Sequence, residues 1–127
     1  GILEAFRNQG MSRKEACLHL PELLKKVELS SETAMRYPRE TSGGECQRAA
    51  IARALAVQPS LLICDEATSA LDAAVQAQIV QLLKKLQREE GLAMLWIGHD
   101  LALVRELCSR GRRGRYWSTR KRNTRNC

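Results

Sequence analysis

Two acidic residues and a histidine follow apolar stretches of the chain at positions where they could act together. Asp65 and Glu66 follow the apolar residues 61–64, and His99 stands two residues after the apolar run at 92–97. A carboxylate pair and an imidazole at one place suit magnesium coordination, water activation and contact with a phosphate. Each group alone is more often structural than catalytic. The chemistry therefore requires a fold that brings the two groups together.

The elements that must position these groups are two strands and the helix between them. Residues 61–65 and 92–97 are short apolar runs, which predict buried strands. Asp72 is expected to cap a helix that ends at Gly91 and carries apolar residues at helical spacing. Such a strand–helix–strand unit forms a parallel sheet covered on both faces, and ligands bind at the carboxyl ends of its strands. We predict an α/β fold with acids and histidine at one sheet edge, followed by a helix over residues 100–108.

A third group, the three residues Ser42, Gly43 and Gly44, is predicted to start another helix. Glu45 completes a capping box with Ser42, and the alanine-rich stretch that follows is expected to be helical until Pro59. A helix N-terminus presents unpaired N–H groups to anions, and glycines let a phosphate approach the backbone closely. An ordinary helix cap explains the same residues, so both interpretations are open at this point.

The chain before this helix is predicted to be helical in pieces. Ser12 and Glu15 form another capping-box pattern, so a helix is expected to start there. Pro21 either kinks this helix or restarts it as a first-turn residue. A short helical piece over residues 32–36 is expected to stop before Pro38.

Composition limits the chain to one modest, aliphatic core. Its 127 residues are 44% hydrophobic but only 4% aromatic. No apolar run approaches the roughly 18 residues that span a bilayer, and no signal-peptide pattern is present. The five cysteines are an odd number without a Cys-x-x-Cys pair. This pattern argues against a disulfide framework or a zinc site and for a reducing cytosol.

The net charge of +7 is concentrated at the carboxyl end. Residues 1–109 hold 13 Lys and Arg against 14 Asp and Glu, a net of −1, whereas residues 110–127 hold 8 basic residues and no acid. A genuine tail of this kind would be a disordered arm for nucleic acid or another anionic surface. A shifted reading frame near Arg110 would produce the same composition, and both interpretations stay open.

The order of four motifs resembles the ATP-binding-cassette (ABC) ATPases. The motifs are SGG at 42–44 as the signature, LLICDE at 61–66 as the Walker B strand, SALD at 69–72 as the D-loop, and the switch histidine His99. The surrounding sequence, over about residues 1–109, resembles the ATPase subunits of bacterial peptide and nickel importers. The resemblance implies a partial P-loop NTPase with a parallel-sheet core and part of the helical signature subdomain.

The resemblance also implies how the chain is divided and where its partners bind. Residues 1–44 would be part of the helical subdomain up to the signature loop. Residues 45–109 would be the signature helix with the Walker B, D-loop and switch-histidine half of the ATPase core, and residues 110–127 the basic tail. The implied partners are a second ATPase subunit in a head-to-tail dimer, membrane permease subunits and, indirectly, a solute-binding protein. The implied location is the cytoplasmic face of the cell membrane, and nucleic acid is not expected as a partner.

Three residues would carry the hydrolysis of ATP by this resemblance. Glu66 would be the general base that polarises the attacking water, and His99 would contact the γ-phosphate. Asp65 would hold Mg²⁺ through water. The cofactors implied are therefore ATP and Mg²⁺.

The other site residues would act between subunits. Ser42, Gly43 and Gly44 would bind the γ-phosphate of ATP held by the opposite subunit. Asp72 would couple the two nucleotide sites across the dimer.

The chain departs from the family pattern in ways that bear on activity. Thr41 and Glu45 stand where the family signature has Leu and Gln, and no Gly-Lys pair occurs, so the phosphate loop is missing. We therefore expect the C-terminal half of an importer ATPase that is inactive alone. The alternative is a nucleic-acid-associated ATPase fragment of the DNA-repair branch, where Ser-Gly-Gly-Glu also occurs, or a non-catalytic remnant with a basic arm.

Overall fold

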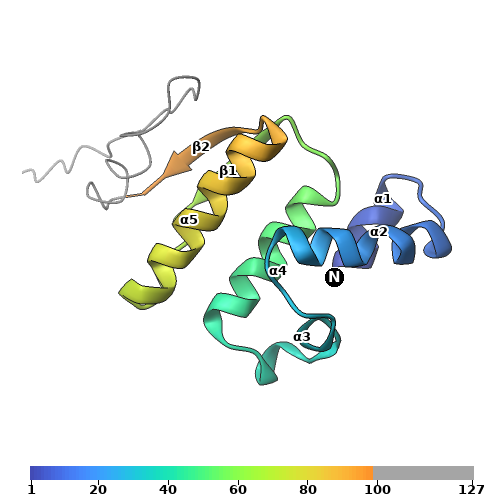
Figure 1. The fold of residues 1–127 in the computed structure, drawn as a ribbon, viewed down its shortest axis with the longest axis horizontal. Coiled ribbons are helices and arrows are strands. Elements are labelled where there is room, and N and C mark those ends of the chain that lie inside the picture. The colour runs from blue at the N-terminus through green and yellow to red at the C-terminus, as the bar shows by residue number, and fades with distance from the viewer. Residues whose placement is uncertain (99–127) are drawn as a thin grey trace, which may run out of the picture.

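The structure, a computed structural model, describes residues 1–98 of the chain. In chain order the elements are α1 (Ile2–Asn8), α2 (Arg13–Lys26), α3 (Ser31–Met35), the 3₁₀ turn η1 (Pro38–Glu40), α4 (Gly43–Leu55), β1 (Leu61–Asp65), α5 (Ala73–Glu90) and β2 (Ala93–Ile97). Figure 1 shows α5 lying along the β1–β2 pair, with the other helices to one side of this unit. His99, the helix expected over residues 100–108 and the basic tail lie outside the described residues.

Helices α2, α4 and α5 begin where the sequence predicts, because capping side chains fix their first turns. At α2, Ser12 Oγ accepts from the N–H of Glu15 at 3.3 Å, and Glu15 Oε2 accepts from the N–H of Ser12 at 2.8 Å. At α5, Asp72 Oδ1 accepts from the N–H of Val75 at 3.0 Å. The helix then ends at Gly91, whose φ of 63° is left-handed. Each cap satisfies a backbone donor that the helix itself leaves unpaired.

The amino-terminal part differs from the prediction in two ways. Helix α2 continues from Arg13 to Lys26 with Pro21 inside it, so a restart at the proline is wrong. Helix α1 is not predicted by the sequence pattern: it has only 7 residues and no side-chain cap at Gly1. It is held instead by burial, since Phe6 is in the core that α2 and α4 share. Tertiary packing of this kind stabilises helices too short to form alone.

The two described strands form a parallel pair in which Leu61 is the register partner of Ala93 and Asp65 of Ile97. Helix α5 connects them and covers one face. On the opposite face the residues Leu61 and Ile63 are 49% and 58% exposed. The prediction of a sheet covered on both faces is therefore wrong for residues 1–98. A continuous apolar run predicts burial on both faces but does not reveal which segment covers each.

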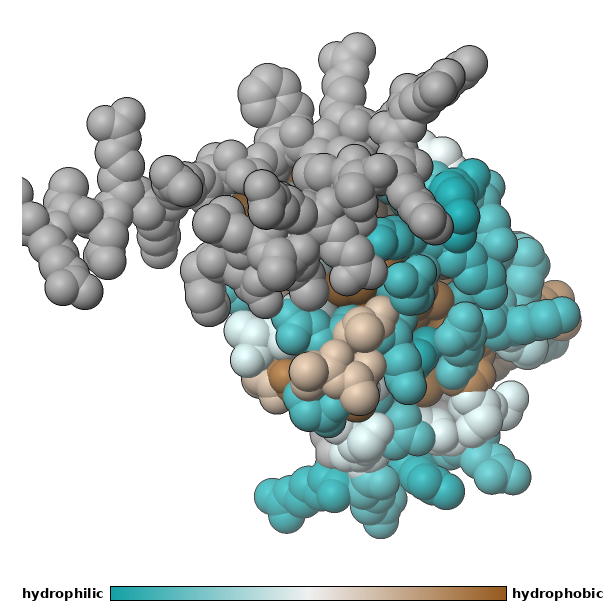
Figure 2. All heavy atoms as spheres, turned by 60° about the vertical axis from the view of Figure 1, so that its left-hand side comes forward, coloured by the Kyte–Doolittle hydropathy of each residue, from teal (hydrophilic) through white to brown (hydrophobic). Residues whose placement is uncertain are grey.

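The core lies between α5, the covered sheet face and helices α2 and α4. The buried residues in it are Ala5 and Phe6 of α1, Ala16, Leu23 and Leu24 of α2, Val27 and Leu29 after α2, Ile51 and Ala52 of α4, Ala56 after α4, Leu62 and Cys64 of β1, Ile79, Val80, Leu82, Leu83 and Leu86 of α5, Leu92 before β2, and Met94 and Trp96 of β2. On the face seen in Figure 2, hydrophilic residues cover most of the coloured surface. Among residues 1–98 no helix is long and apolar enough to cross a membrane.

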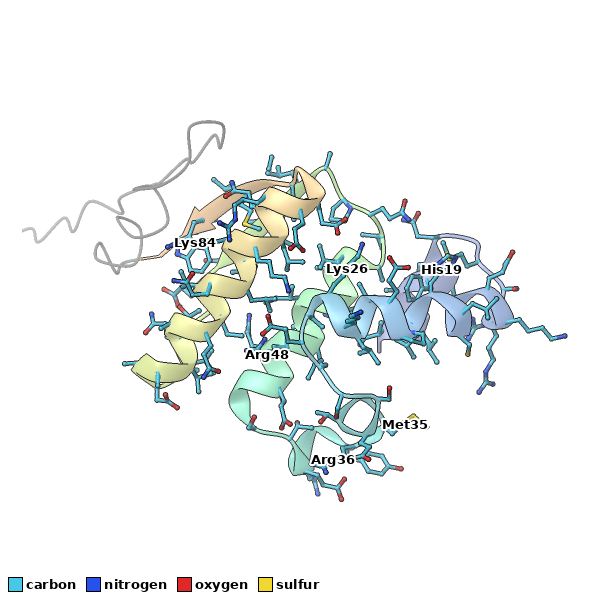
Figure 3. The ribbon with its side chains drawn as sticks, in the orientation of Figure 1. His19, Lys26, Met35, Arg36, Arg48 and Lys84 are labelled. Carbon is cyan, nitrogen blue, oxygen red and sulfur yellow. The ribbon has the colours of Figure 1, made fainter. Side chains whose placement is uncertain are left out.

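One ion-pair cluster joins the end of α2 to α4 and α5. Arg48 of α4 donates to Glu28 Oε2 at 2.9 Å and to the carbonyl oxygen of Val27 at 3.2 Å. The other oxygen of Glu28 lies 3.6 Å from Lys85 Nζ on α5. Figure 3 shows Arg48 in the interior of this junction, where its side chain is only 13% exposed. The cluster fixes the direction of α4, the helix that carries the glycine motif.

Candidate functional site

Strands β1 and β2 end side by side, with the acids of β1 at that edge. Asp65 is the register partner of Ile97. The N–H of Glu66 donates to the carbonyl oxygen of Ile97 at 2.8 Å. The predicted approach of the Asp65–Glu66 pair to the carboxyl end of β2 is thus confirmed. His99 lies two residues beyond Ile97, outside the described residues, so its place beside the acids stays a prediction.

The backbone turns at Glu66, where φ is 47°. The carbonyl oxygen of Glu66 accepts from both the N–H and the hydroxyl of Ser69, each at 3.0 Å, and this fixes the turn. A left-handed φ costs a non-glycine residue about 1–2 kcal/mol, and such strain clusters at functional sites. Glu28 and Gln58 have similar values of 57° and 49°. Strain alone therefore does not single out Glu66, but its hydrogen bonds to Ile97 and Ser69 hold the backbone of Glu66 at the sheet edge.

The segment between β1 and α5 is tied down along its length. Thr68 is buried, and its hydroxyl accepts from Gln76 Nε2 at 3.1 Å. The N–H of Leu71 donates to the carbonyl oxygen of Thr68, also at 3.1 Å. Asp72, predicted as a coupling residue between subunits, acts within this chain as the cap of α5. Its position is thus fixed by the same helix that covers the sheet.

The predicted capping box at the start of α4 is present. Ser42 Oγ accepts from the N–H of Glu45 at 3.2 Å, and Glu45 Oε2 accepts from the N–H of Ser42 at 2.8 Å. The hydrogen bond from the Ser42 N–H lowers the pKa of the Glu45 carboxyl below its ordinary value. The Thr41 hydroxyl lies 2.9 Å from Cys46 Sγ, a contact that closes the same turn from the other side. The first turn of α4 is therefore closed by the capping box, and it carries the negative charge of Glu45.

The two glycines of this turn pack against the start of α5. A Cβ added to Gly44 would lie 2.7 Å from Val75 Cγ1, and one added to Gly43 would lie 3.1 Å from Leu71 Cδ2. The structure thus brings together two groups that the sequence placed 30 residues apart, the SGG motif and the cap of α5. It also gives the glycines a packing role, in addition to the close phosphate approach that the sequence suggests.

The residues at the β1 edge fit Mg²⁺ only as part of a larger ligand set. Among residues 1–98 no group of three His, Cys, Asp or Glu side chains is placed to hold a metal ion. Protein-bound Mg²⁺ commonly uses one or two carboxylates, with waters and substrate phosphates as the other ligands. Asp65 fits that arrangement. The start of α4 presents the N–H groups of a helix N-terminus, which suit a phosphate, whereas the space beside Gly43 and Gly44 is filled by Leu71 and Val75.

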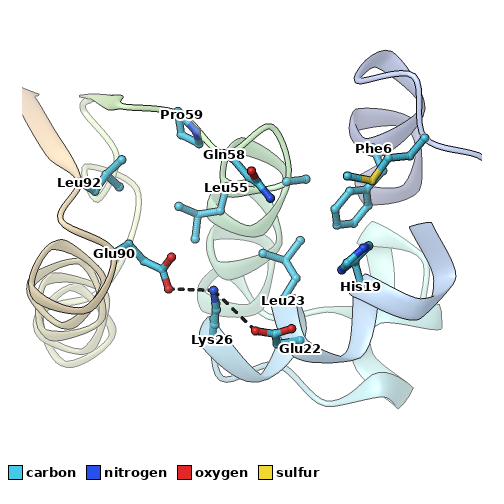
Figure 4. Close-up of a pocket in the computed structure, with 12 residues that line it drawn as sticks. Phe6, His19, Glu22, Leu23, Lys26, Leu55, Gln58, Pro59, Glu90 and Leu92 are labelled. Carbon is cyan, nitrogen blue, oxygen red and sulfur yellow. Dashed lines mark ion pairs between the residues drawn. The ribbon is translucent and has the colours of Figure 1, made fainter. Parts of the chain in front are cut away.

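A pocket among the described residues lies elsewhere. It has a volume of about 320 Å³, and in Figure 4 its lining runs from Glu90 and Leu92 at one end, past Leu55 and Pro59, to Phe6 and His19 at the other. Figure 4 shows Lys26 at its edge, paired with Glu90 at 2.8 Å. Leu55 and Glu90 are the last residues of α4 and α5, whereas the candidate site lies at the amino ends of these helices. The pocket is therefore separate from the site.

Cys64 lies in β1 directly before Asp65, yet it is not a reactive group. The thiol is buried in the core, and burial raises its pKa to about 11. A thiol is nucleophilic only as the thiolate, so Cys64 is a packing residue at neutral pH.

Comparison with known proteins gives consistent matches. The family model described as "ABC transporter" matches residues 3–69. The oligopeptide transport ATP-binding protein OppF of Escherichia coli is 51% identical over 100 residues, which are 79% of this chain and 30% of OppF. A probable peptide ABC transporter ATP-binding protein, y4tS of Sinorhizobium fredii, is 54% identical over 107 residues, 84% of this chain and 30% of that protein. The chain thus spans about 30% of the length of these relatives.

Two solved structures share the fold. A dimeric, post-hydrolysis state of the ATP-binding cassette MJ0796 bound to ADP and Pi superposes with a TM-score of 0.61 at 42% identity, covering 75% of this chain and 41% of that one. A second dimeric structure of MJ0796, a bacterial ABC transporter cassette, gives 0.62 at 40% identity, with 85% and 45% coverage. The predicted fold class, a partial ABC nucleotide-binding domain, is confirmed.

Proposed function

Since the chain belongs to the ABC transporter family, we propose that it is part of the ATP-hydrolysing subunit of an importer that takes up a small solute such as a peptide. The observation that carries the proposal is the edge where Asp65 and Glu66 meet the end of β2. The relatives' names favour peptide over nickel as the solute. They are peptide transport proteins, and nothing among them favours a nucleic-acid-associated ATPase.

The proposed chemistry at the sheet edge is hydrolysis of ATP. Glu66 is assigned the role of general base, because its turn is fixed by Ser69 at the end of a rigid strand. Asp65 is assigned to Mg²⁺ through water, and His99 to the γ-phosphate. A bound Mg²⁺ supplies neutralisation of the phosphate charge. The protein's own contribution is to orient the water and hold the carboxylates in place.

The start of α4 is proposed as the second phosphate-binding element. Ser42, Gly43 and Gly44 would close over ATP held by a second ATPase subunit, and Asp72 would couple the two sites. The dimeric cassette bound to ADP and Pi supports a dimer of this kind. Residues 1–44 are proposed as part of a helical subdomain and residues 45–109 as part of the ATPase core. The subunit would bind membrane permease subunits at the cytoplasmic face of the membrane and receive solute indirectly from a binding protein.

Uptake by cells tests this function. In the complete transporter, we expect Glu66→Gln to lower ATP-dependent uptake of a labelled oligopeptide by about 100-fold or more, the usual loss with a general base. Glu89→Gln, a change at an exposed residue near the far end of α5, is the matched control and should transport normally. If the wild-type transporter takes up nickel but not peptide, the proposed substrate is wrong, and nickel replaces it. Normal uptake of both by Glu66→Gln would refute the proposal.

A further inference from the structure

A chain of hydrogen bonds joins the starts of α3 and α4. Ser30 caps α3, and its Oγ lies 2.9 Å from Thr33 Oγ1 and accepts from the N–H of Thr33 at 3.1 Å. Thr33 Oγ1 donates to Glu45 Oε1 at 3.3 Å. Glu45 Oε2 in turn accepts from the N–H of Ser42 at 2.8 Å. Both oxygens of this carboxylate are thus engaged, one in the capping box of α4 and one on α3, which lies near the start of α4 in Figure 1.

The protons in this chain have one direction. The pKa of Glu45 is lowered, chiefly by the Ser42 backbone N–H, so the carboxyl is ionised at neutral pH and can only accept. The single hydroxyl proton of Thr33 must therefore point at Glu45. The Ser30 hydroxyl must then donate to Thr33. Thr33 thus donates to an acceptor that carries a full negative charge, whereas the side-chain oxygen of a glutamine at position 45 would be a neutral acceptor.

The charge of Glu45 makes its placement important. A carboxylate beside a helix N-terminus is favourable for the helix but repels a phosphate that approaches the same end. Held by Thr33 on one side and Ser42 on the other, the carboxylate stays in the capping box. The positive charge of Arg36, which follows α3 and is labelled in Figure 3, also favours the ionised form of Glu45.

We infer that Thr33 is a positioning residue, which fixes the Glu45 carboxylate and through it the backbone of Ser42, Gly43 and Gly44. This inference rests on the proposed function, in which that backbone closes over a phosphate of ATP. Thr33 touches no phosphate itself. Its effect is to keep the first turn of α4 formed and the Glu45 charge at the side of the turn.

Steady-state ATP hydrolysis by the complete subunit, with Thr33→Val and Thr33→Ser compared, tests the inference. Valine has the same shape without the donor, whereas serine keeps the hydroxyl. We expect Thr33→Val to raise the KM for MgATP about three- to tenfold, the usual worth of one hydrogen bond, and Thr33→Ser to stay within about twofold. In the Glu45→Gln background the effect of Thr33→Val should shrink, because a bond to a neutral amide is weaker. Equal KM values for Val and Ser, or the same loss in both backgrounds, would overturn the inference.

A second measurement does not depend on hydrolysis. Carbon-13 NMR titration of the Glu45 carboxyl in this chain should show a higher pKa in Thr33→Val than in the wild type or in Thr33→Ser. An unshifted pKa in Thr33→Val would refute the contact itself. If the wild-type subunit does not hydrolyse ATP, the proposed function fails, while this titration still decides whether Thr33 positions Glu45. Circular dichroism melting of each variant shows that the helices remain folded.

Discussion

Gly44 of α4 packs directly on Val75 of α5, so closely that a Cβ at Gly44 would lie 2.7 Å from Val75 Cγ1. This contact joins the glycine motif to the first turn of the helix that Asp72 caps. Real Cβ atoms do not approach a neighbour that closely, so any larger residue at position 44 must move α4 away from α5 or displace Val75. The close approach of the starts of α4 and α5 therefore depends on a glycine, which has no Cβ, at position 44.

We expect Gly44→Ala to lower the free energy of unfolding by about 1–3 kcal/mol, the usual cost of overpacking. Alanine is the better helix former by about 1 kcal/mol, but the collision outweighs that gain. Combining it with Val75→Ala should recover most of the loss, because the double variant removes the colliding methyl group. Urea denaturation of the single and double variants measures both effects.

Gly43→Ala is the comparison for this prediction. Its added Cβ would lie 3.1 Å from the flexible end of Leu71, which can move aside, so a smaller loss is expected. Equal stability of the two alanine variants, or no recovery with Val75→Ala, would contradict the packing role of Gly44.

Glu28 is expected to matter for stability, unlike an ordinary surface acid. Glu28→Gln leaves the largely buried Arg48 guanidinium without its charged partner, which should cost about 1–3 kcal/mol. Glu22→Gln is the control, since Glu22 is 71% exposed and lies 3.9 Å from Lys26. Exposed pairs of that kind contribute about 0–1 kcal/mol. Thermal melting measures the Tm of both variants. An equal decrease in Tm would show that the Arg48–Glu28 pair contributes no more to stability than the exposed Lys26–Glu22 pair.

Local signals account for what the sequence predicted well. The caps at Ser12, Ser42 and Asp72 each depend on residues no more than three positions apart, and each is found as predicted. Strand β1 has the predicted bounds, Leu61–Asp65, because its apolar run ends abruptly at the acids. The order of these elements is enough to place Asp65 and Glu66 at the end of β2.

Contacts between distant segments account for what it missed. The bond from Thr33 to Glu45 spans 12 positions, and no periodicity indicates it. Gly44 has a packing reason that appears only once α5 lies beside α4. The apolar run at 61–64 predicts that Ile63 is buried, but Ile63 is 58% exposed. Which segment covers a sheet face depends on tertiary contacts that one apolar run does not encode.

Burial of Cys64 should make stability fall in mildly alkaline solution. Its pKa is raised from 9.0 to about 11, so the unfolded chain loses this proton at a lower pH than the folded chain does. The contribution is fully present below pH 9.0 and is lost as the pH rises to about 11. The free energy of unfolding lost over this pH range is about 2–3 kcal/mol, since each unit of pKa difference is worth about 1.4 kcal/mol.

Urea unfolding of the wild type and of Cys64→Ala between pH 8 and 10.5 measures this loss as the difference in slope. The alanine variant starts from a lower stability, because it leaves a small cavity, but lacks the thiol titration. Parallel pH profiles for the two proteins would show that Cys64 is not responsible.

The isolated 127-residue chain is expected to have no measurable ATPase activity and very weak affinity for ATP. Phosphoryl transfer depends almost entirely on positioning and charge neutralisation, and a phosphate loop with its lysine supplies much of both. No Gly-Lys pair is present in the chain to do so. Asp65 and Glu66 are held at the end of β1, yet a carboxylate edge alone repels a polyphosphate.

In the complete subunit, Glu66→Gln should abolish turnover while ATP binding persists, because it removes the base and leaves the phosphate contacts. Phosphate release and equilibrium binding of labelled ATP measure the two properties separately. Magnesium-dependent hydrolysis by the purified chain that disappears on Glu66→Gln would show instead that these 127 residues suffice for catalysis.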